Sequence, residues 1–181
     1  ILHVVRCFED GNVIHVDGSV DPIRDKEVID MELQLKDLET IEGRISKIKK
    51  IAGTGDKEAV KTLALYEKLE KALQSGQSTR AVELDGHEMT MMKELQLLTA
   101  KPVLYVCNVE EAAVVNGNAY VDRVKEVASS EGAAVMIIGA AIEADIAELD
   151  DSEERAMFLE DMGLKEPGVA QLIRKAYELL N

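Results

Sequence analysis

Aromatic side chains are scarce in this sequence, which has no tryptophan, two phenylalanines and four tyrosines among its 181 residues. Since 46% of the residues are nevertheless hydrophobic, the core is expected to be aliphatic. A chain of this length can bury a sizeable core, and one domain with an appendage is the default expectation.

Cysteine is nearly absent, and long apolar runs are missing. Cys7 and Cys107 lie in short, strand-like apolar runs, so we expect buried free thiols of a reducing compartment rather than a disulfide framework. Three widely spaced histidines give a zinc site no support. Because no apolar segment approaches a membrane span and no signal peptide is recognisable, the sequence predicts a cytoplasmic protein without membrane contact.

Positive charge is in the minority, with 21 Lys and Arg residues against 35 Asp and Glu residues and a formal net charge of −14. A chain this acidic is not expected to bind nucleic acid over its whole surface, so any basic patch has to be local. The main basic run consists of Arg44, Lys47, Lys49, Lys50, Lys57 and Lys61. It fits either a solvated helix face or a contact site for RNA or a ribosomal surface.

Three short apolar runs, at 1–8, 102–107 and 133–138, are typical of buried parallel strands because they are continuous rather than alternating. Between the second and the third, the pattern predicts a helix that ends at Gly132. This order of elements predicts a βαβ unit with a parallel sheet and a right-handed crossover. Residues 9–24 are expected to be irregular, with a brief extended segment at Val13 and Ile14.

Between the first and the second strand, apolar residues recur every three or four positions, which indicates two long amphipathic helices joined by a turn at 53–55. The stripe of the first helix consists of Val28, Met31, Leu35, Leu38, Ile41, Ile45 and Ile48. The sequence therefore predicts an antiparallel coiled-coil arm that, with its connector, occupies 30–86. It interrupts an α/β domain made of 1–29 and 87–181.

Three further helices are expected in the α/β domain. One covers 86–98, and a second begins at the Asp151 cap with Glu154 in the capping-box position. The third runs from 166–168 to Leu179, and its apolar face consists of Val169, Leu172, Ile173 and Ala176. The many carboxylates between Glu143 and Glu154 are interpreted as solvated and structural rather than as a metal site.

The strand at 102–107 stops at Asn108-Val109-Glu110-Glu111, where an open α/β sheet binds its ligands. In purine-nucleotide-binding P-loop proteins, an Asn-Lys-x-Asp at such a strand end reads the base. Here Val109 replaces the Lys and Glu111 the Asp, and a carboxylate one methylene longer should no longer fit the two donors of guanine. Taken alone, the tetrapeptide fits an ordinary turn better, because Asn commonly ends strands.

Six stretches of the sequence, at 3–10, 18–25, 32–38, 101–111, 140–149 and 173–181, resemble the Obg-like ATPase family, known as YchF or EngD in bacteria. Examples are His-Val-Val-Arg-Cys-Phe-Glu-Asp at 3–10 and Lys-Pro-Val-Leu-Tyr-Val-Cys-Asn-Val-Glu-Glu at 101–111. The stretches run the length of the chain in family order, and an arm inserted into the G domain is a trait of this family.

The resemblance implies a partial G domain of a P-loop NTPase, part of a protein that binds the ribosome and hydrolyses ATP in preference to GTP with Mg²⁺. We expect this protein to be a monomer. The base-reading motif of the family falls on Asn108, Val109 and Glu111. Its second base-contacting loop falls on Gly139, Ala140 and Ala141, where backbone groups would have to act. Phe8 ends the first strand and either packs on the base or is an ordinary core residue.

The family's phosphate loop, Gly-x-x-x-x-Gly-Lys-Ser/Thr, does not occur in this sequence. By the resemblance, that loop, the Mg²⁺ ligands and both switch regions would precede Ile1, and a TGS domain would follow Asn181. Phosphoryl transfer depends on these groups, so the chain is expected to carry base recognition but no catalysis of its own. The alternative from a different class is an interaction module that docks on a ribosome or RNA through its basic arm.

Overall fold

A computed structural model describes residues 1–10 and 19–180, so the extended segment expected at Val13 and Ile14 lies outside the described residues. The chain divides into two compact units. One contains residues 1–26 and 103–181, and the other contains residues 27–102. None of the described helices is both long and apolar enough to cross a membrane.

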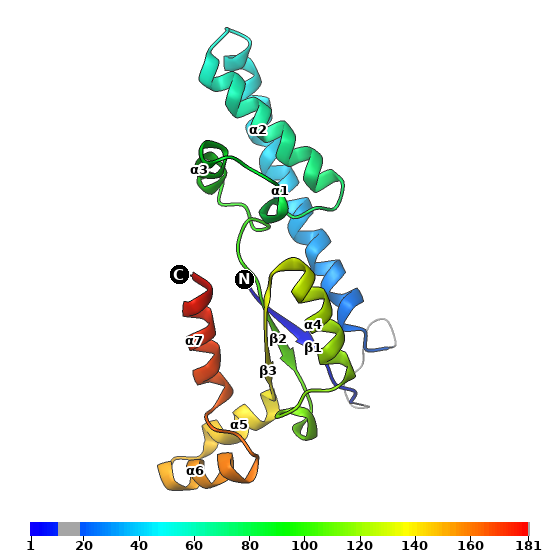
Figure 1. The fold of residues 1–181 in the computed structure, drawn as a ribbon, viewed down its shortest axis with the longest axis vertical. Helices are drawn as coiled ribbons and strands as arrows, with labels where there is room; N and C mark the ends of the chain where they lie inside the picture. Colours follow the sequence, from blue (N-terminus) through cyan, green and yellow to red (C-terminus); the bar gives the residue numbers. More distant parts are fainter. Residues whose placement is uncertain (11–18, 181) are drawn as a thin grey trace. The chain divides into compact units, whose positions relative to one another are not determined.

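The first unit is built on a parallel sheet of β1 (Leu2–Arg6), β2 (Leu104–Asn108) and β3 (Ala134–Ile138), in that order (Figure 1). The register pairs Arg6 with Asn108 and Asn108 with Ile138, so the three strands end side by side. All residues of β2 except Asn108 are buried, as the continuous apolar run predicts. The predicted α/β class with a parallel sheet is confirmed.

Helices cover both faces of the sheet (Figure 1). On one face, α4 (Ala119–Glu131) packs Val121 and Val124 against the face that carries Tyr105. Gly132 ends α4 in the left-handed conformation, at φ 65°, which favours glycine. On the other face, α7 (Gly168–Leu180) packs Leu172 against Leu104 and its neighbours.

Two features of this unit were not predicted from the sequence. The structure contains a further helix, α5 (Ala140–Glu148), because Ile142 and Ile146 pack against α6 (Ser152–Asp161). The apolar face expected for the last helix is only partly covered, since Val169 and Ile173 are 54% and 55% exposed. Leu172 and Leu179 of α7 pack instead on the strands.

The second unit is a helical hairpin of α1 (Pro22–Ala52, which begins in the first unit) and α2 (Lys57–Gln74). Asp21 precedes α1 and accepts hydrogen bonds from the backbone of Ile23 and Arg24, so the helix begins at Pro22, earlier than expected. The hairpin core includes Ile41 and Ile45 of α1 and Leu65, Leu69 and Leu73 of α2.

The expected apolar stripe of α1 is covered over only part of its length. Val28, Met31 and Leu35 are 50%, 60% and 56% exposed, whereas Ile41 is fully buried. The physical reason is length, because α1 has 31 residues and α2 has 18. The partner helix therefore cannot cover the beginning of α1.

The second unit also contains a 3₁₀ turn at Thr79–Ala81 and α3 (Gly86–Glu94). Asp85 and Glu88 form a capping box at α3, which ends four residues before the expected Leu98. Met91 and Leu95 pack on the hairpin core, so this compact unit extends to Pro102 rather than to residue 86. The division into a G domain and an inserted arm stays a prediction.

Candidate functional site

Asn108, the last residue of β2, connects two neighbouring strand ends. Its Oδ1 accepts a hydrogen bond of 2.9 Å from the backbone N–H of Ala140, the first residue of α5. Gly139 precedes Ala140 at the N-cap position and has no side chain with which to cap α5. Asn108 therefore supplies the missing cap from a neighbouring strand.

The amide nitrogen of Asn108 has no partner among the described residues. The Oδ1 bond fixes the orientation of the side chain, so the two N–H groups of Nδ2 remain available to an acceptor. A purine ring nitrogen is an acceptor of this kind. The use of Asn108 in base recognition stays a prediction.

The loop after β3 has little room for side chains. A Cβ added at Gly139 would lie 3.0 Å from Cδ1 of Ile142 and 3.4 Å from Cγ2 of Val114. Ala140 and Ala141 follow at exposed positions. A ligand at this loop would meet backbone groups and methyl groups, as the sequence analysis predicts.

A cavity of about 440 Å³ lies at the carboxyl ends of the strands. It brings together the predicted residues Phe8, Asn108, Val109, Glu111, Gly139 and Ala141. Ala140, the remaining predicted residue, does not line the cavity but is held by Asn108. The predicted residues come from three separate parts of the chain and gather at one place.

Val109 and Phe8 line this cavity. The side chain of Val109 is 4% exposed, and its N–H donates to the carbonyl of Ile138 at 2.9 Å. Phe8 is half-buried and lies 4.8 Å from the guanidinium of Arg6, whose Nε donates to the Phe8 carbonyl. A cation over one ring face leaves the other face of Phe8 for packing.

Sequence reasoning missed the acidic lining of the cavity. Glu9, Asp10 and Glu110 join Glu111 around it, and no Lys or Arg among the described residues lines it. Four carboxylates attract hydrogen-bond donors and repel phosphate, so the cavity suits a base better than a phosphate chain. Within the described residues, no group of three His, Cys, Asp or Glu side chains is placed to hold a metal ion.

Asn118 was also missed as a site residue. It caps α4 through Oδ1, which accepts from the N–H groups of Tyr120 and Val121. Its Nδ2 donates to the carbonyl of Cys7 at 2.7 Å and lies 3.2 Å from a carboxylate oxygen of Glu110. One side chain thereby links the end of β1 to the loop after β2.

Tyr120 adds a second link from α4 to the cavity wall. Its hydroxyl donates to Glu9 at 2.6 Å, and this hydrogen bond to a carboxylate raises the pKa of Tyr120. The sequence signal for these links is Asn116-Gly117-Asn118, which indicates only a turn before the next helix. Pairing of Asn118 with Cys7, 111 residues away in the sequence, follows from the fold.

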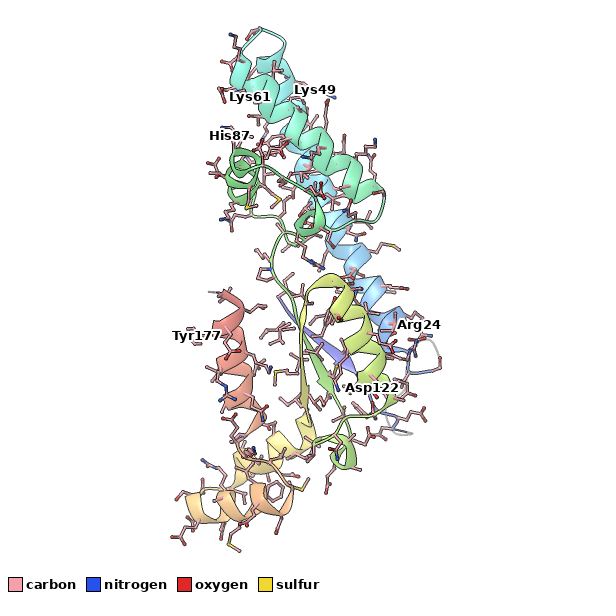
Figure 2. The ribbon with its side chains drawn as sticks, in the orientation of Figure 1. Arg24, Lys49, Lys61, His87, Asp122 and Tyr177 are labelled. Carbon is pink, nitrogen blue, oxygen red and sulfur yellow. The ribbon has the colours of Figure 1, made fainter. Side chains whose placement is uncertain are left out.

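The predicted basic residues lie in the other unit, around the turn of the hairpin. All six are exposed, with four on α1 and two on α2. Figure 2 shows Lys49 and Lys61 on the two helices near this turn. Lys49 lies 3.7 Å from Glu67, and Lys61 lies 2.9 Å from Glu58. The sequence between residues 43 and 61 contains six basic residues and two acidic ones, Asp56 and Glu58.

The parallel sheet with helices on both faces and the long helical hairpin are consistent with a partial G domain of the P-loop NTPases. No family model matches the chain. The chain is 48% identical over 181 residues to the ribosome-binding ATPase YchF of Escherichia coli O157:H7, covering 100% of this chain and 49% of the relative. It is 46% identical over 182 residues to the ribosome-binding ATPase YchF of Bacillus subtilis, covering 99% of this chain and 50% of the relative.

A solved structure agrees with these relatives. The Schizosaccharomyces pombe YchF GTPase matches with a TM-score of 0.85 and 31% identity over 99% of this chain and 50% of that one. The resemblance predicted from the sequence is confirmed, because the chain is similar over nearly its whole length to ribosome-binding ATPases YchF and to a YchF GTPase. It spans about half the length of the curated relatives it matches.

Proposed function

We propose that this chain supplies the base-binding half of a nucleotide site in a longer YchF-type protein that hydrolyses ATP. The observation that carries the proposal is the Asn108 side chain, which lines a strand-end cavity, is held by Ala140 and keeps its amide nitrogen without a partner among the described residues. In open α/β sheets, ligands bind at this end of the strands. The family relatives named as ATPases and a GTPase support a nucleotide as the ligand.

In this proposal the purine lies between Phe8 on one side and the Gly139–Ala141 loop on the other. Asn108 donates to a ring nitrogen, and Glu111 accepts from an exocyclic amine. Adenine is preferred because Glu111 is too long to receive both edge donors of guanine. The phosphates and Mg²⁺ are bound by residues outside this chain, and therefore the 181-residue chain alone does not turn over ATP.

The experiment compares hydrogen exchange of the full-length protein that contains this chain, the parent protein, with and without ATP and Mg²⁺. Segments 7–10, 108–111 and 139–142 should exchange more slowly when nucleotide is bound, while residues 44–61 of the hairpin should not change. Protection confined to other segments would refute a base site at these strand ends. Measurable ATP turnover by the 181-residue chain would refute the proposal that catalysis requires residues outside this chain.

A second function is favoured by the basic hairpin turn. We propose that Arg44, Lys47, Lys49, Lys50, Lys57 and Lys61 contact ribosomal RNA, because phosphate contacts require only charge and reach. The relatives are named as ribosome-binding, which supports a ribosomal partner and a cytoplasmic location for the parent protein. The two functions are compatible because the charged turn and the cavity are in different units.

A further inference from the structure

The outer edge of β3 is open. Within the described residues β3 pairs only with β2. The carbonyl of Ile138 accepts a hydrogen bond of 2.9 Å from the N–H of Val109, and the N–H of Ala134 donates one of 3.3 Å to the carbonyl of Val103. Backbone groups of alternate residues in a strand point to opposite sides. Val135 and Ile137 therefore direct their N–H and C=O groups away from the sheet, where they have no partner among the described residues.

A groove of about 410 Å³ follows this edge. Val135–Ile138 of β3 line one side of it, and most of its other lining residues belong to the segment 163–168 and the first turns of α7. Gly168 closes one end, since a Cβ there would lie 2.9 Å from Cγ1 of Ile138. The groove lies apart from the strand-end cavity and shares only Gly139 with it.

Three lysines from three different segments reach this groove. They are Lys125 of α4, Lys165 of the loop before α7 and Lys175 of α7. Lys165 and Lys175 have no carboxylate partner among the described residues, and Lys125 is 3.5 Å from Asp122. Uncompensated positive charge is unusual in a chain with a net charge of −14.

The acidic residues of the groove are already engaged. Glu143 accepts hydrogen bonds from the N–H groups of Gly168 (2.6 Å) and Val169 (3.1 Å) and so caps α7. Glu166 is ion-paired with Arg174, and this hydrogen bond lowers the pKa of Glu166. Both carboxylates keep their charge, but their hydrogen-bond partners are the start of α7 and Arg174 rather than a lysine of the groove.

We propose that this groove binds an extended, acidic segment of a partner polypeptide, which adds to the sheet as a strand beside β3. The open backbone edge selects a polypeptide, because only a peptide chain offers N–H and C=O groups at strand spacing. The lysines select acidic side chains at the positions that flank the new strand. A ribonucleotide strand would satisfy the lysines but would leave the edge of Val135 and Ile137 unpaired.

The test uses the parent protein and a fluorescent pool of peptides about six residues long, a usual strand length, in which Glu alternates with Val and Thr. The matched pool carries Lys in place of Glu. We expect the acidic pool to bind and the basic pool not to bind. Hydrogen exchange of residues 133–139 should slow only with the acidic pool, which locates binding on the edge.

Two variants separate charge from folding. K165E/K175E should weaken binding of the acidic pool at least roughly tenfold, whereas K36E/K71E, which changes two lysines on the hairpin helices, should leave it unchanged. Failure of the acidic pool to bind overturns the proposal. Binding that survives K165E/K175E, or displacement of the peptides by an oligoribonucleotide without protection of 133–139, overturns it as well.

Discussion

The two units use buried polar groups differently. In the hairpin unit, Asp37 is 2% exposed and accepts from the N–H groups of Leu98 and Thr99 and from the Thr99 hydroxyl, at 2.7–2.8 Å. In the sheet unit, Asn108 is only half-buried and keeps an amide without a partner among the described residues. A fully satisfied polar group stabilises a fold, whereas a fixed but partly unsatisfied one is ready for a ligand.

The largest effect should come from removing the buried carboxylate of the hairpin unit. Asp37→Ala leaves the N–H groups of Leu98 and Thr99 without an acceptor, which should lower the free energy of unfolding by about 3 kcal/mol. Chemical denaturation measures this change. Glu42→Ala, at an exposed position of the same helix, serves as the control and should change stability by no more than about 0.5 kcal/mol.

The folded Asp37→Ala variant of the parent protein should bind nucleotide with the same affinity as the unsubstituted protein, because Asp37 belongs to the hairpin unit and the cavity to the sheet unit. An unchanged unfolding free energy would contradict the structural role of this carboxylate. A specific loss of nucleotide affinity would contradict the separation of the two units by function.

Charge reversal at the hairpin turn should have the next largest effect. K47E/K49E/K50E in the parent protein should weaken ribosome association roughly tenfold to a hundredfold and should flatten its dependence on salt, because phosphate contacts are lost. Co-sedimentation with ribosomes at several salt concentrations measures both. The control K36E/K71E/K93E reverses three other exposed lysines of the same unit, and an equal loss for this variant would argue against a site at the turn.

Asn108→Ala should affect ligand binding more than stability. It removes the cap of Ala140 and the donor for the base, so ATP affinity of the parent protein should fall roughly tenfold, about 1.4 kcal/mol. Isothermal titration measures this affinity. Asn116→Ala, at an exposed position after the same strand, is the matched control. If both variants bind ATP equally well, Asn108 is a strand-terminating residue only.

The ends of the strands could be predicted from the sequence, because each buried strand is a continuous apolar run that is followed by polar or small residues. Gly132 likewise marks the end of α4, since its positive φ is a local requirement. The bond from Asn108 to Ala140 joins residues 32 apart and depends on the strand register, which no local pattern specifies. The role of Asn118 was missed for the same reason.

Two other misses come from tertiary packing. The Ala-rich start of α5 could be read as a continuation of a strand end, and only its packing against α6 defines it as a helix. The apolar stripe of α1 is genuine, but the length of α2 decides how much of it is covered. Periodicity predicts that a helix has an apolar face and does not predict what covers that face.

A smaller effect is expected on base preference. Glu111→Asp shortens the carboxylate by one methylene and should reduce the preference for ATP over GTP several-fold. Competition of the two nucleotides for the parent protein gives the ratio. Glu110→Asp is the matched control, because Glu110 contacts Asn118 and not, in our proposal, the base. If only Glu110→Asp changed the ratio of ATP to GTP affinity, Glu110 rather than Glu111 would be the carboxylate that contacts the base.

The smallest effect concerns the capping box of α3. The backbone N–H of Glu88 donates to the carboxylate of Asp85 and lowers its pKa. The backbone N–H of Asp85 donates in turn to the carboxylate of Glu88 and lowers its pKa. A carboxyl with a depressed pKa stabilises the fold above its unfolded pKa, and this contribution is lost as the pH falls through the folded pKa. Amide exchange of His87 and Glu88, corrected for intrinsic rates, should therefore accelerate below about pH 4. A pH-independent protection would contradict the cap.

The most direct test of the central claim is a competition titration on the parent protein with a fluorescent ATP analogue and Mg²⁺. Our account predicts that unlabelled ATP displaces the analogue far better than GTP and that Asn108→Ala weakens ATP binding while Asn116→Ala does not. If GTP displaces the analogue better, or if Asn108→Ala leaves ATP binding unchanged, the strand-end cavity does not read adenine as proposed.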